Sequence, residues 1–287
     1  MRDFSANHET LSINTATVRK QWPLDRIIDE CARRDIRAIS PWRDQVATVG
    51  IDRIARRLRE TGIHLSGYCR GGFFPAADPA GLGAALEDNR KAIDEARLLD
   101  APCLVLVVGS LPGALTGTPA YVDISRARSE VRDGIAASLE YAREVGMPLA
   151  IEPLHPMQAA DRACINTLEQ ALDLCDELDP GRTGMLGVAA DLYHVWWDPK
   201  LEAQLMRAGA DRLLAYHVCD WLTPTRDLLN DRGMMGDGII ELKKCRRWAE
   251  AAGYSGCAEV EIFSDYWWSK PGEEVLDTCI ARHKTVV

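Results

Sequence analysis

The sequence predicts an α/β fold, a single (β/α)8 TIM barrel that forms one domain over residues 1–287. Short apolar runs of strand length alternate with segments of helical period, and this pattern occurs eight times. Strands that alternate with helices imply a parallel sheet, and eight units are the number that closes a barrel. No linker, low-complexity tract or break in composition divides the chain. An open doubly wound sheet would be expected to show a G-x-G-x-x-G turn after its first strand, where this chain has NTATVR.

The first four units follow from the spacing of their apolar residues. The run CLVLVVG is nearly all apolar, as a strand covered on both faces must be. Gly62 marks the end of the second predicted helix, because glycine is common just after a helix C-terminus. We expect strands over 11–16, 38–42, 64–69 and 103–109, and helices over 24–34, 51–61, 84–99 and 125–146.

The last four units continue the same alternation. Thr167 is a good N-cap for the helix that follows the fifth strand. Residues 220–238 are expected to form a long loop after the seventh strand, and long barrel loops often carry function, so this loop is a candidate lid. We expect strands over 149–154, 186–192, 213–219 and 258–263, and helices from 167 onward, over 199–209, over 239–253 and over 272–284.

Composition narrows the function classes. The formal net charge of -9 disfavours a protein that grips phosphate backbones, so we expect no nucleic-acid partner. The N-terminal stretch has no apolar signal core, and nowhere do about 18 apolar residues run together. We therefore expect a cytoplasmic protein that does not bind membranes. The nine cysteines contain no C-x-x-C pair and lie mostly in apolar runs, which indicates buried reduced thiols.

Four of the predicted strands carry a metal-binding side chain near their C-terminal end, namely Glu152, Asp191, His217 and Glu261. Catalytic groups of a (β/α)8 barrel lie at this end of the strands, and a buried acid is costly unless it is paired or bound to a cation. Three carboxylates and one imidazole favour one divalent metal ion, Mn²⁺ first, with Mg²⁺, Co²⁺ or Zn²⁺ as alternatives. Taken singly, each acid could instead cap the next helix or pair with an arginine.

These motifs resemble the xylose isomerase-like sugar isomerase/epimerase superfamily over nearly the full chain. The matching pieces are the Glu of IEP, the D-x-x-H of DLYH, the His of YHVCD, a G-D-G and the Glu of VEIF. The resemblance implies that the four residues bind one metal and that Glu152 and Glu261 act as bases. It also implies that His194 and an arginine of the 220–238 loop hold the substrate, Arg226 before Arg232. The implied chemistry is proton abstraction next to a sugar carbonyl through a metal-stabilised enediolate.

Two features depart from a plain epimerase. EPLHP places His155 three residues past Glu152, and aromatic side chains beside the predicted site loops, Trp197 and Phe74 among them, could line the substrate pocket. Both features are similar to the catalytic α subunits of C-glycoside deglycosidases. That resemblance implies a lyase that cleaves 3-oxo-glycosides, with His155 removing the C2 proton and a small β subunit as partner. The aromatic residues could also simply pack in the core, and His155 could be a loop residue that contacts backbone.

The lyase is our first hypothesis, and an isomerase or epimerase of a ketose or keto-sugar is the close alternative. In both cases the partner is a sugar or glycoside, and a homo-oligomer is compatible with either. A repair endonuclease shares this barrel but would need three metals, more histidines and a basic groove. The chain has only six histidines and a net charge of -9, which disfavours this class. A sugar sensor would not need a Lewis acid.

Overall fold

The computed structural model describes residues 2–287 and contains one sheet of nine parallel strands. The order of the strands in the sheet is β3-β2-β1-β11-β8-β7-β6-β5-β4. Their bounds are β1 (Leu11–Asn14), β2 (Ala38–Ser40), β3 (His64–Leu65), β4 (Tyr68–Gly72), β5 (Leu104–Val107), β6 (Leu149–Glu152), β7 (Leu186–Asp191), β8 (Leu213–Val218) and β11 (Ala258–Val260).

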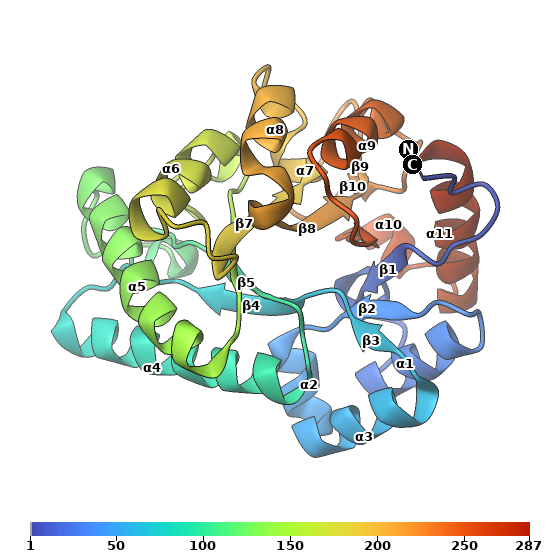
Figure 1. The fold of residues 1–287 in the computed structure, drawn as a ribbon, viewed down its shortest axis with the longest axis horizontal. Coiled ribbons are helices and arrows are strands. Elements are labelled where there is room, and N and C mark those ends of the chain that lie inside the picture. Colours follow the sequence, from blue (N-terminus) through green and yellow to red (C-terminus); the bar gives the residue numbers. More distant parts are fainter. Residues whose placement is uncertain (1) are drawn as a thin grey trace.

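The two ends of this sheet are consecutive in the chain. β3 and β4 stand at opposite ends of the strand order and are separated only by Ser66 and Gly67. Together they form the third strand of the barrel, so the nine strands fill eight positions. A bridge between Trp42, just after β2, and Cys69 of β4 closes the ring. The result is a nearly closed (β/α)8 barrel with helices around it (Figure 1). The predicted fold is confirmed.

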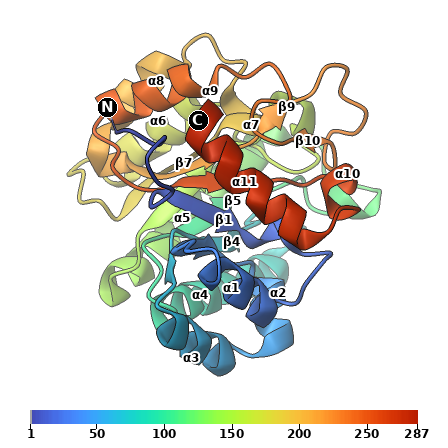
Figure 2. The same cartoon turned by 90° about the vertical axis from the view of Figure 1, so that its right-hand side faces the viewer.

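Long helices cover the outside of the barrel between successive strands (Figures 1 and 2). They are α1 (Leu24–Ala32), α3 (Ile51–Thr61), α4 (Pro79–Leu98), α5 (Ile124–Val145), α6 (Leu168–Leu178), α8 (Leu201–Arg212), α9 (Leu242–Ala251) and α11 (Gly272–Val286). The short helices α2 (Arg43–Val49), α7 (Leu192–Val195) and α10 (Asp265–Trp268) were not predicted.

Local sequence explains where several helices begin and end. The Thr167 hydroxyl accepts a hydrogen bond from the Gln170 N–H at the start of α6, as its side chain predicts. Asp123 caps α5 in the same way. Gly62 adopts the left-handed conformation, with φ of 72°, directly after α3.

The apolar side chains form two layers. The larger lies between the strands and the surrounding helices, and the smaller fills the interior of the barrel with mostly small residues, including Ala150, Ala189 and Ala215. Eight of the nine cysteines are buried, and Cys257 is partly buried. Within residues 2–287, no helix has the length and hydropathy that crossing a membrane requires.

The segment 220–238, predicted as a long loop, contains a short two-stranded antiparallel ribbon. β9 (Asp220–Trp221) pairs with β10 (Arg232–Gly233), so that Arg232 stands opposite Trp221. The Asp220 carboxylate accepts hydrogen bonds from the N–H groups of Trp221, Gly236 and Ile240, which ties the two ends of the segment together. The ribbon returns the chain over the end of the barrel and positions Arg232 there.

Candidate metal centre and sugar site

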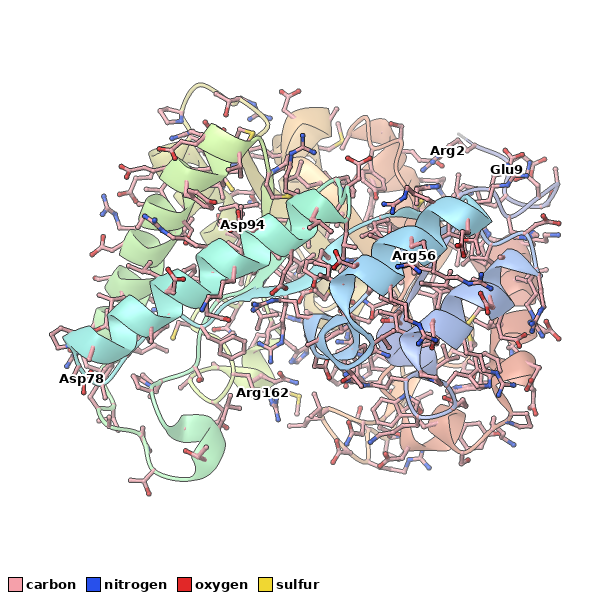
Figure 3. The ribbon with its side chains drawn as sticks, turned by 90° about the horizontal axis from the view of Figure 1, so that it is seen from below. Arg2, Glu9, Arg56, Asp78, Asp94 and Arg162 are labelled. Carbon is pink, nitrogen blue, oxygen red and sulfur yellow. The ribbon has the colours of Figure 1, made fainter. Side chains whose placement is uncertain are left out.

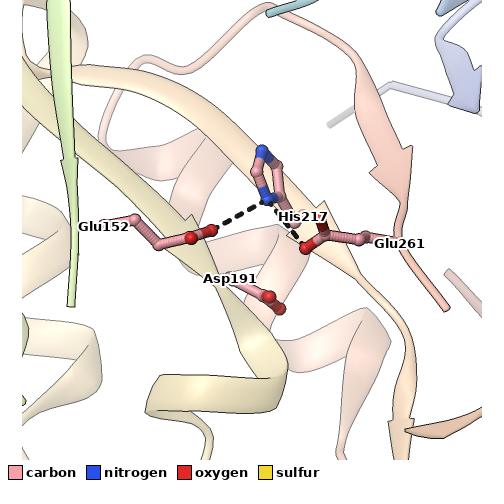
Figure 4. Close-up of side chains that lie close together, drawn as sticks. All are labelled: Glu152, Asp191, His217 and Glu261. Atoms are coloured by element: carbon pink, nitrogen blue, oxygen red, sulfur yellow. Dashed lines mark ion pairs between the residues drawn. The ribbon is translucent and has the colours of Figure 1, made fainter. Parts of the chain in front are cut away.

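The four predicted metal ligands meet at the C-terminal ends of neighbouring strands. Glu152 ends β6, Asp191 ends β7, His217 is the penultimate residue of β8, and Glu261 directly follows β11. Each side chain offers one ligand atom, and these atoms all lie within 4.8 Å of one another (Figure 4). All four side chains are buried. The structure therefore brings together residues that span more than a hundred positions of the sequence.

The pleat of the strands explains why these side chains point inward. Successive side chains of a strand alternate between its two faces, so the residue two positions before each ligand also faces the barrel interior. The strand register places Asp191 beside His217 and His217 beside Glu259. These interior positions are held by Ala150, Ala189, Ala215 and Glu259.

The chemistry of this cluster fits a divalent metal ion. His217 Nδ1 lies 3.3 Å from Glu152 Oε1 and 3.6 Å from Glu261 Oε2. Within residues 2–287, neither His217 Nδ1 nor Glu152 Oε1 has a hydrogen-bond partner, although both are buried. Burying such atoms without a partner costs free energy, and a shared cation would remove that cost. The oxygen-rich donor set suits Mn²⁺, Mg²⁺, Co²⁺ or Zn²⁺.

Arg232 is the arginine that the structure places in this site. Its Nη1 donates to Asp191 Oδ2 at 2.7 Å and to Glu261 Oε2 at 3.1 Å. The guanidinium is buried and lies 4.4 Å from the centre of the Tyr193 ring. It therefore fixes two of the candidate ligands from one side.

Arg226 does not reach the site, which corrects our preference for it over Arg232. Its side chain is 67% exposed and pairs with Asp231. Both arginines lie in the same segment, but only Arg232 belongs to the ribbon that folds back over the barrel.

Burial and neighbouring charge set the protonation of the cluster. Burial raises the pKa of Glu261 to about 7, and the nearby Glu152 carboxylate adds to the increase. Burial alone would also raise the pKa of Asp191, but the adjacent Arg232 holds it well below its usual range. Burial opposes a charged His217, yet the surrounding carboxylates, Glu259 first, raise its pKa well above the ordinary value. A positive charge is therefore favoured at the centre of the cluster.

His194 stands beside the cluster as a neutral imidazole. Burial lowers its pKa to about 3, and the positive charge of Arg232 contributes to the decrease. His194 Nδ1 accepts a hydrogen bond from the His155 backbone N–H at 3.1 Å, and its Nε2 lies 3.2 Å from Arg232 Nη2. Nε2 lies 3.6 Å from Asp191 Oδ2, and the residue lines the cavity described below.

The His155 ring packs against aromatic side chains rather than facing the cluster. It stacks on Trp221 at a centroid distance of 4.7 Å and meets Trp197 edge to face at 5.8 Å. Its Nδ1 accepts a hydrogen bond from the Met157 N–H. The Trp197 indole N–H donates to the His194 carbonyl oxygen. His155 and Trp197 thus contact His194 and each other, and within residues 2–287 neither lines the cavity described below.

Phe74 is a core residue, which corrects its assignment to the substrate pocket. It is fully buried against α5, where Gly134 has no Cβ that would collide with its ring. The preceding residue, Phe73, has a positive φ of 59°, which interrupts the alternation of the strand. Phe73 consequently lines the cavity in place of Phe74.

A cavity of about 210 Å³ opens onto the cluster. Glu152 and Glu261 form part of its wall together with His194 and Arg232, so two candidate bases and two candidate substrate-binding groups share it. Its aromatic wall consists of Trp42, Phe73 and Phe263, and its remaining cationic residues are Arg70 and Arg162.

Glu259 is a site residue that the sequence analysis missed. Its carboxylate is buried, lies 3.4 Å from His217 Nε2, and accepts hydrogen bonds of 2.8 Å from Asn14 and Ser66. The signal was available in the AEVEIF run, where two glutamates two residues apart must share a face of the strand.

Comparisons with known proteins agree with this arrangement. Residues 28–282 match a family model described as a xylose isomerase-like TIM barrel. Inosose isomerase of Halalkalibacterium halodurans is 22% identical over 216 residues, which cover 75% of this chain and 71% of that protein. L-ribulose-5-phosphate 3-epimerase UlaE of Shigella flexneri serotype 5b is 26% identical over 232 residues, which cover 79% of this chain and 74% of that protein.

Solved structures share the fold. Protein SMc04130 from Sinorhizobium meliloti 1021 is similar with a TM-score of 0.91 and 55% identity, covering 97% of this chain and 98% of that chain. The IOLI protein with a bound zinc atom has a TM-score of 0.82 at 19% identity, with 97% and 98% of the two chains covered. At that identity the second likeness shows the fold alone.

Proposed function

Because the chain belongs to the xylose isomerase-like TIM barrel family, we propose that it is a divalent-metal-dependent isomerase or epimerase of a ketose or keto-sugar. The observation that carries this proposal is the convergence of Glu152, Asp191, His217 and Glu261 on one point beside a cavity. The isomerase and the epimerase among its relatives support it.

The four converging residues would hold the metal. The bound ion would polarise the sugar carbonyl and stabilise the negative charge that develops on oxygen during proton abstraction. Mn²⁺ is our first candidate because three of the four donors are carboxylates. The zinc in the similar IOLI structure supports Zn²⁺ as the alternative.

Glu152 and Glu261 are the candidate proton carriers. They project from β6 and from the end of β11, which are separated in the sheet by β7 and β8, so they approach the cavity from different sides. One carboxylate would take the proton next to the carbonyl, and the other would return a proton to the opposite face.

His194 and Arg232 would orient the sugar. The neutral His194 lines the cavity beside Arg232, whose Nη2 lies 3.2 Å from His194 Nε2. Arg232 holds the pKa of Asp191 low and keeps Asp191 and Glu261 in place through its two hydrogen bonds. Its charge also lies where a negatively charged intermediate would form.

The lyase hypothesis has less support than this alternative. Two relatives with a stated activity are an isomerase and an epimerase. Within the described chain, His155 is not among the residues that line the cavity, and Tyr68, Phe74, Trp221 and Trp267 are buried packing residues. A cavity of about 210 Å³ suits a bare sugar better than a glycoside with an aromatic aglycone. A small β subunit was expected only with the lyase activity.

The test incubates the protein, loaded in turn with Mn²⁺, Co²⁺ or Zn²⁺, with a panel of ketoses and 3-oxo-glycosides in D₂O. We expect metal-dependent exchange of the proton next to the carbonyl, seen by NMR, and formation of an epimer or isomer. Glu152→Gln and Glu261→Gln should each lose the activity, whereas His155→Gln should keep most of it. Release of an aglycone that depends on His155 would instead establish the lyase.

A further inference from the structure

Three arginines line the cavity, and two of them have no acidic partner. Arg232 pairs with Asp191 and Glu261. For Arg70 and Arg162, no carboxylate of residues 2–287 comes within the 4.0 Å of an ion pair. Both side chains are partly buried, so their charges are not fully solvated. An unpaired, partly desolvated cation in a substrate cavity costs free energy, and a bound anion would reduce that cost.

Other arginines near this rim show what an ordinary structural arginine does here. Arg19 pairs with Asp44, and Arg43 pairs with both Asp88 and Glu95. These paired residues face a neighbouring hollow and do not line the cavity beside the metal cluster. Arg70 also borders that hollow, but within residues 2–287 it has no carboxylate partner, whereas Arg19 and Arg43 do.

Arg70 is held in place by aromatic rings. Its guanidinium lies 4.0 Å from the centre of the Phe73 ring and 5.6 Å from that of Trp42, and these two rings form part of the aromatic wall. Burial lowers the pKa of Arg70, the Glu152 carboxylate opposes this decrease, and the positive charge of Arg162 lowers the pKa further. The two guanidinium groups are thus close enough to repel each other, and an anion between them would relieve that repulsion.

Arg162 belongs to the loop that connects β6 to α6. Its backbone N–H donates to the carbonyl of Gln158, whose own side chain donates to the Leu228 carbonyl in the segment after β8. Figure 3 shows Arg162 on the opposite side of the molecule from Arg2 and Glu9, which precede β1. It therefore lies at the end of the barrel at which the strands terminate and the cavity opens.

The two arginines add positive charge beside the metal cluster. Glu152, Asp191, Glu259 and Glu261 supply four negative charges, and Arg232 and one divalent ion would supply three positive charges. Arg70 and Arg162 then present two positive charges to the cavity, and a phosphate monoester carries close to two negative charges at neutral pH. Guanidinium groups also match the oxygen geometry of phosphate and carboxylate.

We propose that the sugar substrate carries an oxyanion group, a phosphate ester or a carboxylate, which Arg70 and Arg162 bind beside the aromatic wall. This inference rests on the proposed function for the identity of the site as a sugar site. It predicts that the site prefers anionic sugars over neutral ones, because a neutral sugar would leave both guanidinium groups without a counter-charge.

The test measures binding by titration calorimetry on the full-length, metal-loaded protein. The probes are matched pairs: D-ribulose with D-ribulose 5-phosphate, and D-fructose with D-fructuronate, plus inorganic phosphate alone. We expect one anionic sugar to bind at least about tenfold more tightly than its neutral counterpart. The phosphate and carboxylate pairs distinguish which oxyanion the site prefers.

Variants assign the preference to the two arginines. Arg162→Gln and Arg70→Gln should each remove most of the advantage of the anionic sugar, and Arg162→Lys should restore part of it. Arg19→Gln removes the same charge from a neighbouring, paired arginine and should keep the advantage. Equal affinity for charged and neutral sugars, or an advantage that survives both glutamine variants, would overturn the inference.

Failure of the proposed function gives a different result. Metal-dependent proton exchange on a neutral ketose, without preference for the anionic partner, would keep the proposed function and reject the anion site. Arginine-dependent binding of an anionic sugar without any exchange would keep the anion site and reject the isomerase or epimerase.

Discussion

Glu259 Oε1 lies 3.4 Å from His217 Nε2, on the side of the imidazole away from Glu152 and Glu261. Glu259 stands two residues before the candidate ligand of its strand. In the other three strands the residue at this position is alanine, so only one strand carries a carboxylate there. Asn14 and Ser66 hold Glu259 in place with hydrogen bonds of 2.8 Å. A carboxylate in this position fixes the ring orientation and leaves Nδ1 free to bind a metal.

We predict that Glu259→Gln weakens metal affinity by about 10–100-fold, the usual effect of losing such a partner. Competition with a chromophoric chelator would measure the dissociation constant for Mn²⁺ and Zn²⁺. Glutamine has nearly the same shape: its oxygen can still accept from Asn14, and its amide nitrogen can donate to the Ser66 hydroxyl, so the metal-free variant should remain folded by circular dichroism. An unchanged dissociation constant would show that Glu259 has no role in positioning His217.

Metal removal should destabilise the folded protein. The cluster buries three carboxylates around one imidazole, and a cation that binds only the folded state stabilises it by mass action. At a metal concentration of about 100 times the dissociation constant, the gain is about 2.7 kcal/mol. For a chain of 287 residues we expect Tm to rise by about 4–5 °C.

Differential scanning calorimetry with and without EDTA would measure this shift. His217→Gln removes the imidazole at the centre of the cluster and should abolish the response to metal. Arg226→Gln alters an exposed residue outside the cluster and should leave the response intact. A response that persists in His217→Gln would locate the ion elsewhere.

Arg232 and Arg226 should differ sharply when substituted. Arg232→Gln removes one partner of a buried charge network and leaves Asp191 and Glu261 uncompensated, which typically costs about 3–5 kcal/mol. Arg226→Gln removes an exposed arginine, and the buried Asp231 keeps its hydrogen bond from the backbone N–H of residue 226, so the cost should be smaller, about 1–2 kcal/mol. Urea denaturation of both variants would measure the two free energies of unfolding. Equal costs would contradict the placement of Arg232 in the site.

The barrel and the candidate ligands could be predicted because both depend on local patterns. The apolar run of each strand marks its position, and a polar residue at the end of such a run must face the barrel mouth or solvent. Glu152, Asp191 and Glu261 were found in this way. Glu259 was missed because only the tip of its strand was considered, although the period of two requires it to share a face with Glu261.

The remaining differences arise from contacts that are distant in the sequence. Arg226 and Arg232 cannot be distinguished locally, because the pairing of β9 with β10 decides which of them lies over the barrel. Phe73 and Phe74 exchange roles because the positive φ of Phe73 interrupts the strand and Gly134 of α5 makes room for Phe74. Neither the ribbon nor the helix contact has a periodic signal.

His283 connects the two termini far from the metal cluster. Its ring in α11 stacks on Phe4 at a centroid distance of 4.5 Å, and its Nε2 lies 3.3 Å from the Thr10 hydroxyl. Figures 1 and 2 show the N- and C-terminal ends of the chain close together. Burial lowers the pKa of His283 to about 3, and the neighbouring His8, Arg246 and Arg2 lower it further.

We predict that this histidine makes the fold less stable in mild acid. The unfolded chain takes up a proton near pH 6.5 and the folded chain only near pH 3, so stability falls as the pH decreases between these values. At pH 5.5 the loss from this one group is about 1.4 kcal/mol. Scanning calorimetry at pH 7.5 and 5.5 should show a smaller decrease in Tm for His283→Phe, which keeps a ring stacked on Phe4. His64→Gln, at an exposed position of β3, should retain the wild-type decrease. If His283→Phe loses as much stability in acid as the wild type, the pH dependence arises from other groups.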